Sequence, residues 1–193
     1  MKADHKAGIQ IKETKINNIA RVGAYLIDWY IASMFAGIPI TLIASTVNHS
    51  KLVTMELAKI QAPWGLIAGI LAIVFYLGYY VILELKVYKG QTFGKRLMKL
   101  KVVQDDGSDV TFKTIMMREG LGVMLVEGYI AQSSSYVRQI IQMFIDVNIM
   151  DYLVYGFGII SIVSILLGMT SYSRKMIHDR IAKTKLISVK EEE

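Results

Sequence analysis

The sequence predicts an all-α membrane protein, and three observations carry that prediction. Apolar residues make up 53% of the 193 residues, more than an ordinary soluble domain contains. Lys and Arg gather in three stretches, which alternate with long apolar runs. Positive charge at the ends of such runs is typical of membrane spans whose basic ends lie in the cytoplasm. We therefore expect about four transmembrane helices, an amphipathic interfacial helix and a small basic cytoplasmic layer.

The composition also argues against several classes of function. The chain has no cysteine, which excludes disulfides, thiolate nucleophiles and Cys-ligated metals. Its histidines, His5, His49 and His178, are scattered without the spacing of metal ligands. The net charge of +6 would suit nucleic acid, but the positive residues flank apolar runs, so no nucleic-acid partner is expected. Residues 133–135 are serines without a visible His or Lys base, so we expect no enzyme, no cofactor and no metal.

The first span is predicted over residues 19–47, after a polar, basic tail at residues 1–18. Roughly 20 apolar residues suffice to cross a bilayer, so this run is long enough to cross with a tilt. Its length and the polar head before it argue against a cleaved signal peptide. Pro39 lies near its far end and is expected to kink or end the helix.

Asp28 is the first candidate for a functional site, because it lies well inside this span. Arg21 precedes it by seven residues, which puts both side chains on one face, about 10.5 Å apart along the axis. An ionised Asp at the centre of a span costs roughly 2.5 to 3.5 kcal/mol and usually has a partner. Two interpretations stay open. Asp28 forms a structural ion pair with Arg21 or Arg118, or it binds a proton or cation.

The second span is predicted over residues 63–85 and begins with Pro63 in its first turn. Gly65 and Gly69 form a small-residue face that allows close approach of another helix, inside the chain or from another protein. Glu84 is a further candidate for a proton or ion site. Its expected depth near the inner interface favours instead a carboxylate that is solvated by headgroups.

A basic loop is predicted over residues 86–112. Between positions 86 and 101 it holds six Lys or Arg and no acid, which places the end of the second span inside the cell. Lys95, Arg96 and Lys99 are expected to attract anionic lipid headgroups, at about 1 kcal/mol for each nearby cation.

The segment 113–131 is predicted to be either a third span or a re-entrant hairpin. We favour the span because of its length, with Arg118 near its inner end. Apolar residues then recur at helical spacing from 137 to 145 opposite polar ones, which predicts an amphipathic helix in the outer interface. Glu127 and Asp151 are expected near the outer boundary.

The last span is predicted over residues 149–171, and residues 172–193 form a second cytoplasmic tail. Residues 100–104 and 185–189 both have the character of short strands, and we hypothesise that they pair as a small sheet in the basic layer.

Several ordered motifs resemble the RDD family over roughly residues 16 to 190. They are Arg21-x-x-Ala24-Tyr-Leu-Ile-Asp28, Gly90-Gln-Thr-Phe-Gly-Lys-Arg-Leu97, Lys101-Val-Val, Asp106-Gly107, Arg118-Glu119 and His178-Asp179-Arg-Ile-Ala-Lys-Thr184. The resemblance implies a single RDD-like transmembrane domain, residues 19–171, in the inner membrane of a bacterium, with both termini cytoplasmic. Of the Arg and two Asp that name the family, the first two match Arg21 and Asp28 and the third matches Asp179. Lys99 and Lys183 stand where the family commonly has Gly.

Two functions follow as hypotheses. The first is a small transporter of protons or a monovalent cation, with cation/proton exchange at Asp28 and with Arg21 or Arg118 tuning its pKa. Few polar residues lie at mid-depth, so this hypothesis also predicts a homo-oligomer. The second is a non-transporting adaptor or regulator of another membrane protein, such as a peptidase, in which the charged residues form a structural clamp.

Overall fold

The computed structural model describes residues 17–48, 54–127, 129, 131–145, 150–171 and 173–189. Most of the predicted N-terminal tail, the last four residues of the C-terminal tail and the residues between the predicted interfacial helix and the last helix lie outside this part of the chain. Within it the protein is mostly helical with one two-stranded sheet, as the predicted fold class requires.

Three of the described helices are long and apolar enough to cross a membrane. α1 spans Asn18–Val47. α2 spans Trp64–Ile82 and continues as a π-helical turn, η2, over Leu83–Val87. α6 spans Met150–Thr170. Pro39 lies inside α1 and does not end it.

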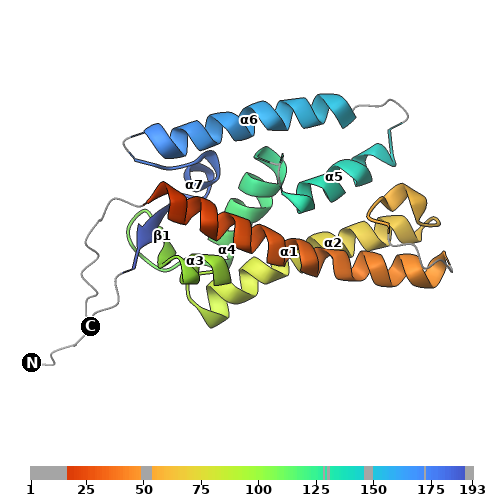
Figure 1. Cartoon of the computed structure of the whole chain (residues 1–193), viewed down its shortest axis with the longest axis horizontal. Helices are drawn as coiled ribbons and strands as arrows, with labels where there is room; N and C mark the ends of the chain where they lie inside the picture. Colours follow the sequence, from red (N-terminus) through yellow and green to blue (C-terminus); the bar gives the residue numbers. More distant parts are fainter. Residues whose placement is uncertain are drawn as a thin grey trace, which may run out of the picture.

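The segment predicted as a third span is interrupted, and together with the helix after it we call it the third passage, residues 112–142. α4, Phe112–Ile115, continues as the π-helix η3, Met116–Val126, and α5 follows over Gln132–Gln142. The four residues of α4 and eleven of η3 rise at most about 22 Å, less than the roughly 30 Å of a hydrocarbon core. After the break, α5 carries the chain on toward the far end of α2 (Figure 1).

α5 also differs from the predicted interfacial helix in what it contacts. Tyr136 is buried, and the backbone N–H of Leu57 donates to Oε1 of Gln139 at 2.8 Å. Leu57 lies in the 3₁₀ turn η1, Leu57–Lys59, just before α2. Part of α5 is therefore packed on α2 and η1 within the protein, while Ile141 and, just beyond α5, Phe144 remain 36% and 72% exposed.

Small residues set the packing of α1 on α2. The buried face of α1 recurs every four residues, and it consists of Ala24, Asp28, Ala32, Ala36, Ile40 and Ala44. α2 presents Gly65, Ala68, Gly69 and Ala72. Such faces let helix backbones approach closely. Asp28 thus points from the packed face of α1 toward α2, away from lipid.

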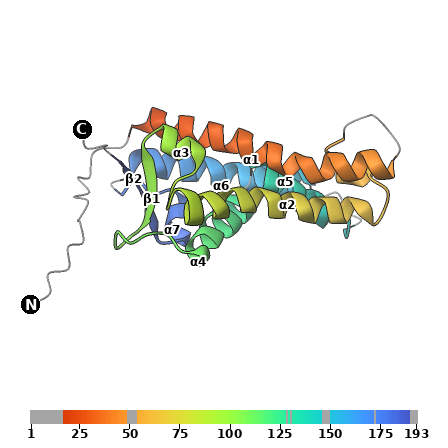
Figure 2. The ribbon, with the colours of Figure 1, turned by 90° about the horizontal axis from the view of Figure 1, so that it is seen from below.

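A basic layer, residues 89–104 and 174–188, closes one end of the bundle (Figures 1 and 2). It contains the short helices α3, Phe93–Leu97, and α7, Ile177–Ile181, and the strands β1, Leu100–Gln104, and β2, Thr184–Ser188. The strands pair antiparallel, with Val102 opposite Leu186, which confirms the hypothesised sheet. The start of α1 and the end of β2 both lie at this end (Figure 1).

Candidate functional site

Asp28 is held by neutral hydrogen-bond donors. Its side chain is 2% exposed. Oδ1 accepts from the hydroxyl of Tyr79 at 2.7 Å and from the backbone N–H of Gly94 at 2.8 Å, and Oδ2 accepts from the hydroxyl of Thr92. Neither of the ion pairs expected for Asp28, with Arg21 or with Arg118, occurs in the described structure. Asp28 instead joins α1 to α2 and to the start of α3.

The glycines of the motif at 90–97 explain how α3 reaches this carboxylate. Gly90 has φ +87°, which favours glycine. Thr92 is the N-cap of α3 and accepts from the backbone N–H of Lys95. A Cβ at Gly94 would overlap the carbonyl oxygen of Ala24 and the carboxyl of Asp28. Glycine is required there because the backbone of α3 touches α1.

Glu84 and Lys95 form a buried ion pair. Oε1 of Glu84 lies 2.5 Å from Nζ of Lys95, and Glu84 has no exposed surface. Lys95 is 8% exposed, lies over the ring of Tyr80 and comes within 3.8 Å of Glu119. These positions differ from the headgroup contacts expected for Glu84 and Lys95, because α3 folds back under the end of α2. Burial lowers the pKa of Lys95, but Glu84 and Glu119 outweigh it and raise the pKa above its ordinary value.

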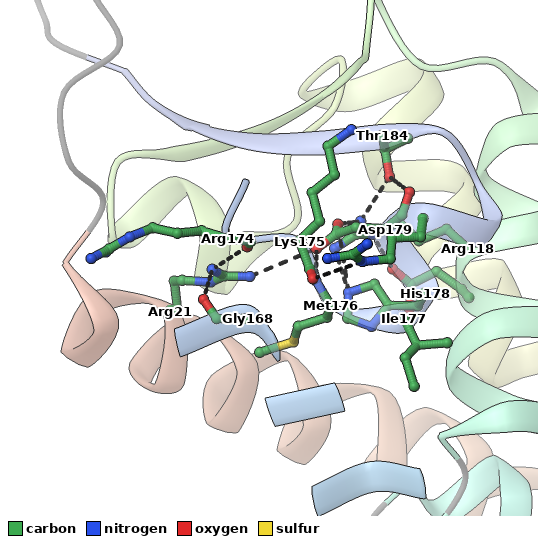
Figure 3. Close-up of polar contacts among 12 residues, drawn as sticks. Arg21, Arg118, Gly168, Arg174, Lys175, Met176, Ile177, His178, Asp179 and Thr184 are labelled. Atoms are coloured by element: carbon green, nitrogen blue, oxygen red, sulfur yellow. Dashed lines mark hydrogen bonds and ion pairs between the residues drawn. The ribbon is translucent and has the colours of Figure 1, made fainter. Parts of the chain in front are cut away.

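Arg118 is the centre of a second set of contacts, on η3 and α7. Its guanidinium donates to Oδ1 of Asp179, and at 3.2 Å to Glu119. It also donates to the hydroxyl of Thr184 at 3.0 Å and lies 3.0 Å from Nε2 of His178. Figure 3 shows the contacts of Arg118 with α7 and β2. Arg118 thereby joins the third passage to the end of the chain.

Arg21 reaches the same carboxylate from α1. Its Nη2 lies 3.7 Å from Oδ2 of Asp179, and its Nη1 donates to the carbonyl oxygens of Gly168 at 3.2 Å and Arg174 at 2.8 Å (Figure 3). The Arg and the second Asp of the motif therefore meet, while the first Asp lies elsewhere. Burial favours the neutral acid, but the positive charge of Arg118 holds the pKa of Asp179 well below its ordinary value.

Glu127 and His178 complete this set, and sequence reasoning missed both roles. Glu127 accepts from the backbone N–H of His178 at 2.5 Å and lies 2.9 Å from its Nδ1. Gly122 permits the approach, because a Cβ there would lie 2.6 Å from the Cβ of His178. Glu127 was expected at the outer boundary. It instead contacts α7 of the basic layer, because η3 ends at Val126 and the carboxylate of Glu127 turns toward His178.

We call these nine residues the buried charged network: Arg21, Asp28, Glu84, Lys95, Arg118, Glu119, Glu127, His178 and Asp179. Among the described residues it combines five carboxylates with only three permanent cations, so two carboxylates have no permanent cation of their own. Oε2 of Glu84 is buried and has no hydrogen-bond partner in the described structure. Buried polar atoms without partners are rare and costly. The network has room for added positive charge.

A cavity of about 340 Å³ lies beside the network, between α1, η3 and α6. Charged and polar lining comes from Arg21, Asp28, Lys95, Arg118, Glu119, Glu127 and His178, and apolar lining from Val22, Leu26, Val123, Ile165 and Met169. The volume falls in the range of small-ligand sites. A small molecule or ion in this cavity would touch both apolar walls and buried charges.

The remaining candidates lie apart from the network. The small-residue face packs inside the chain, since Gly65 faces the backbone of Leu57 and Gly69 faces Ile140. Arg96 stacks its guanidinium on Tyr88, and Lys99 has φ +54° at the end of α3. No group of three or more His, Asp or Glu suited to a metal occurs among the described residues.

Comparison with known proteins gives one match. The model of the RDD family matches residues 18–183, nearly the whole described chain. Neither a curated protein nor a solved structure matches this chain.

Proposed function

Since this chain belongs to the RDD family of membrane proteins, we propose that it is a small transporter that exchanges protons for a monovalent cation. The family membership and the apolar helices support a membrane protein, and the buried charged network supplies the chemistry. We propose no catalytic role and no cofactor.

The observation that carries this proposal is the excess of carboxylates in the buried charged network, three of which, Asp28, Glu119 and Glu127, line the cavity. Two carboxylates of the network lack a permanent cation, and one oxygen of Glu84 lacks any donor. Uncompensated negative charge in a low-dielectric site is strongly unfavourable. Protons or a monovalent cation would compensate it, and each could replace the other. Competition of this kind is what couples two ions in an exchanger.

Glu119 is our candidate for the exchanging carboxylate. It lines the cavity and is 4% exposed. Its two nearby cations, Lys95 at 3.8 Å and Arg118 at 3.2 Å, are shared with Glu84 and Asp179, so Glu119 has no permanent cation of its own. Asp28, the first candidate from the sequence, already accepts three hydrogen bonds from neutral donors. We assign Asp28 a positioning role, which is to hold α3 and thereby Lys95 in place.

The broken third passage supports movement of an ion past the network. Interrupted helices in transporters occur where the backbone lines a cavity or a site. η3 ends at Val126 and α5 begins at Gln132, and Glu127 at the break contacts His178. We propose that this break is where the ion path passes from the cavity toward the far side of the membrane.

We propose a bacterial cytoplasmic membrane as the location, crossed four times, with the basic layer and both termini in the cytoplasm. The support is the crowding of Lys and Arg into that layer, as the positive-inside rule requires. Exposed Arg96 and Lys99 in the same layer suit anionic headgroups as a partner.

The test is cation-dependent dissipation of a proton gradient in proteoliposomes. We expect wild type to respond to Na⁺, K⁺ or Li⁺, and Glu119→Gln to lose most of the response. Glu56→Gln is the matched control, because Glu56 is 64% exposed and pairs with Lys59 outside the network. Folding of each variant is checked by thermal unfolding. Absence of cation-dependent dissipation in wild type would overturn the proposal. Loss of the response in Asp28→Asn, with a normal response in Glu119→Gln, would assign the exchange to Asp28 instead.

A second candidate function, an adaptor for another membrane protein, has one observation in its favour. Exposed side chains follow α6 at alternating spacings of three and four residues: Tyr152, Tyr155, Ile159, Ile162 and Leu166. That spacing is typical of a helix–helix seam. The seam would equally serve a second copy of the chain, which is the homo-oligomer expected from the sequence.

Single cysteines test the seam cleanly because the chain has none of its own. Tyr155→Cys and Ile162→Cys should form cross-links in native membranes. Val74→Cys on α2 is the control, because Val74 is 56% exposed outside the seam. A cross-linked band at twice the mass indicates a homodimer, and a band of another mass indicates an adaptor. Equal cross-linking of Val74→Cys would exclude a specific seam on α6.

A further inference from the structure

We infer that the cavity between α1, η3 and α6 binds a lipophilic ammonium compound, which enters from the bilayer. That the ligand is positively charged rests on the proposed cation function, and the class of the ligand goes beyond it. A bare cation needs oxygen ligands alone, whereas this cavity offers an acidic end and a long apolar wall.

The first step concerns the entrance. Val22 and Leu26 on α1 and Met169 on α6 line the cavity, yet they are 57%, 52% and 48% exposed. Arg21 bridges α1 to the carbonyl of Gly168 on α6 near the basic layer. Beyond that bridge the two helices diverge (Figure 1). The exposed lining belongs to helices long and apolar enough to span a membrane, so the cavity opens toward lipid.

The second step concerns the charge of the ligand. The three cations that line the cavity already have acceptors within the protein. Arg21 donates to two carbonyls, Lys95 pairs with Glu84, and Arg118 donates to Asp179, Glu119 and Thr184. Only Oε1 of Glu119 takes part in a described hydrogen bond or ion pair. The acceptor that remains for a ligand is thus a carboxylate oxygen, and the network has carboxylates in excess.

The third step concerns the body of the ligand. Apolar wall from Val123 and Ile165 continues the line of Val22 and Leu26, and Tyr25 and Tyr80 supply aromatic rings. Aromatic faces attract cations, and an apolar pocket with a few polar groups is the usual form of a small-molecule site. A primary ammonium on a short aryl or alkyl chain matches that arrangement.

The experiment uses three probes that share one apolar body: 4-phenylbutylamine, 4-phenylbutanol and 4-phenylbutyrate. Their binding to the full chain in nanodiscs is measured by calorimetry, in zwitterionic lipid without free amines. We expect the amine to bind about tenfold or more tightly than the alcohol, and the carboxylate not to bind. Tightest binding of the carboxylate, or equal binding of amine and alcohol, would overturn the inference.

Two variants connect the binding to this cavity. Glu119→Gln should weaken binding of the amine about tenfold and leave binding of the alcohol unchanged. Glu56→Gln should change the binding of neither. Val123→Trp narrows the cavity without touching a charge and should weaken amine and alcohol alike, which keeps the test decisive if Glu119→Gln does not fold. Unchanged amine binding in Val123→Trp would overturn the assignment.

Two controls separate this inference from its alternatives. Nanodiscs that contain phosphatidylethanolamine should bind the amine as tightly, whereas displacement by that lipid would mean that the site takes an aminolipid headgroup instead. Amine binding without cation-driven proton flux would refute the proposed transport alone. Flux without amine binding would refute this inference alone.

Discussion

The two halves of the basic layer are built alike and carry opposite charges at a matching position. In each half a basic residue with positive φ follows a long apolar helix, Lys89 after α2 with η2 and Arg174 after α6. A five-residue helix, a lysine with positive φ and a five-residue strand follow, first as α3 and β1, then as α7 and β2.

The third residue of each short helix shows the difference. It is Lys95 in α3 and Asp179 in α7, and both are buried. Lys95 reaches across to Glu119 of the third passage, and Asp179 reaches across to Arg21 of the first. Each half therefore supplies the charge that the other lacks, and the sheet joins them. The cavity is lined from both halves, by Lys95 and Leu100 of the first and by His178 and Leu186 of the second.

The two aspartates of the motif divide along the same line. Asp28 accepts from neutral donors of the first half, whereas Asp179 lies between two guanidiniums. Asp28 orders the backbone of α3, and Asp179 balances the charge of two arginines. Mutations should separate these roles by how much stability each one costs.

The largest effect is expected for Asp179→Asn, which leaves Arg118 and Arg21 buried beside a neutral amide. Breaking a buried pair by removing one partner costs about 3 to 5 kcal/mol. Thermal unfolding in detergent measures the loss. Asp109→Asn is the control, since Asp109 is 61% exposed in its pair with Lys101 and surface pairs contribute about 0 to 1 kcal/mol. Similar shifts for both variants would contradict a buried charge balance.

The next effect is expected for Gly94→Ala in the first half. The added methyl group would overlap the carbonyl of Ala24, and overpacking typically costs about 1 to 3 kcal/mol. Gly78→Ala is its control, because nothing lies within 4 Å of a Cβ there, and Ala in a helix is favoured over Gly by up to about 1 kcal/mol. If both variants unfold at the wild-type temperature, α3 does not pack tightly on α1.

Asp28→Asn should be milder than Asp179→Asn. Its oxygen still accepts from Tyr79 or Gly94, so the loss is the difference between charged and neutral hydrogen bonds, about 1 to 2 kcal/mol. The same unfolding assay applies, with Asp179→Asn as the reference. A cost as large as that of Asp179→Asn would mean that Asp28 also balances charge.

The smallest effect, of opposite sign, is expected for Lys99→Gly and Lys183→Gly. Both residues have positive φ, 54° and 52°, a conformation that costs an L-residue roughly 1 to 2 kcal/mol. Each glycine should stabilise by up to about 1 kcal/mol after its own entropy cost. Lys185→Gly, in β2, should instead destabilise. Loss of stability in both turn variants would show that the lysine side chains hold the layer together.

Much of the fold could be predicted because its signals are local. Long apolar runs mark α1, α2 and α6, and turn residues with alternating patterns mark β1 and β2. The third passage could not be predicted in the same way. Arg118, Glu119 and Glu127 interrupt its apolar pattern, and only their partners on α3 and α7 show how these buried charges are satisfied.

The site was predicted only in part, for the same reason. Asp28, Arg21, Arg118, Asp179 and Glu84 all belong to the buried charged network, but the expected pairing of Asp28 with an arginine does not occur. Glu84 was misplaced because depth was judged along one helix, whereas α3 folds back to bury it with Lys95. The two departures from the family motif, Lys99 and Lys183, were an unused signal for positive φ.

The meeting of Arg21 with Asp179 also constrains how the protein is made. α1 and η3 are synthesised before α7, so Arg21 and Arg118 exist before the carboxylate of Asp179 that they share. Arg118 can pair at once with the adjacent Glu119, but the carboxylate that pairs with Arg21 in the finished structure is absent until α7 is made. The contact that fixes the start of the first long helix therefore depends on a segment that follows the last one, so the two cannot be joined until most of the described chain has been synthesised.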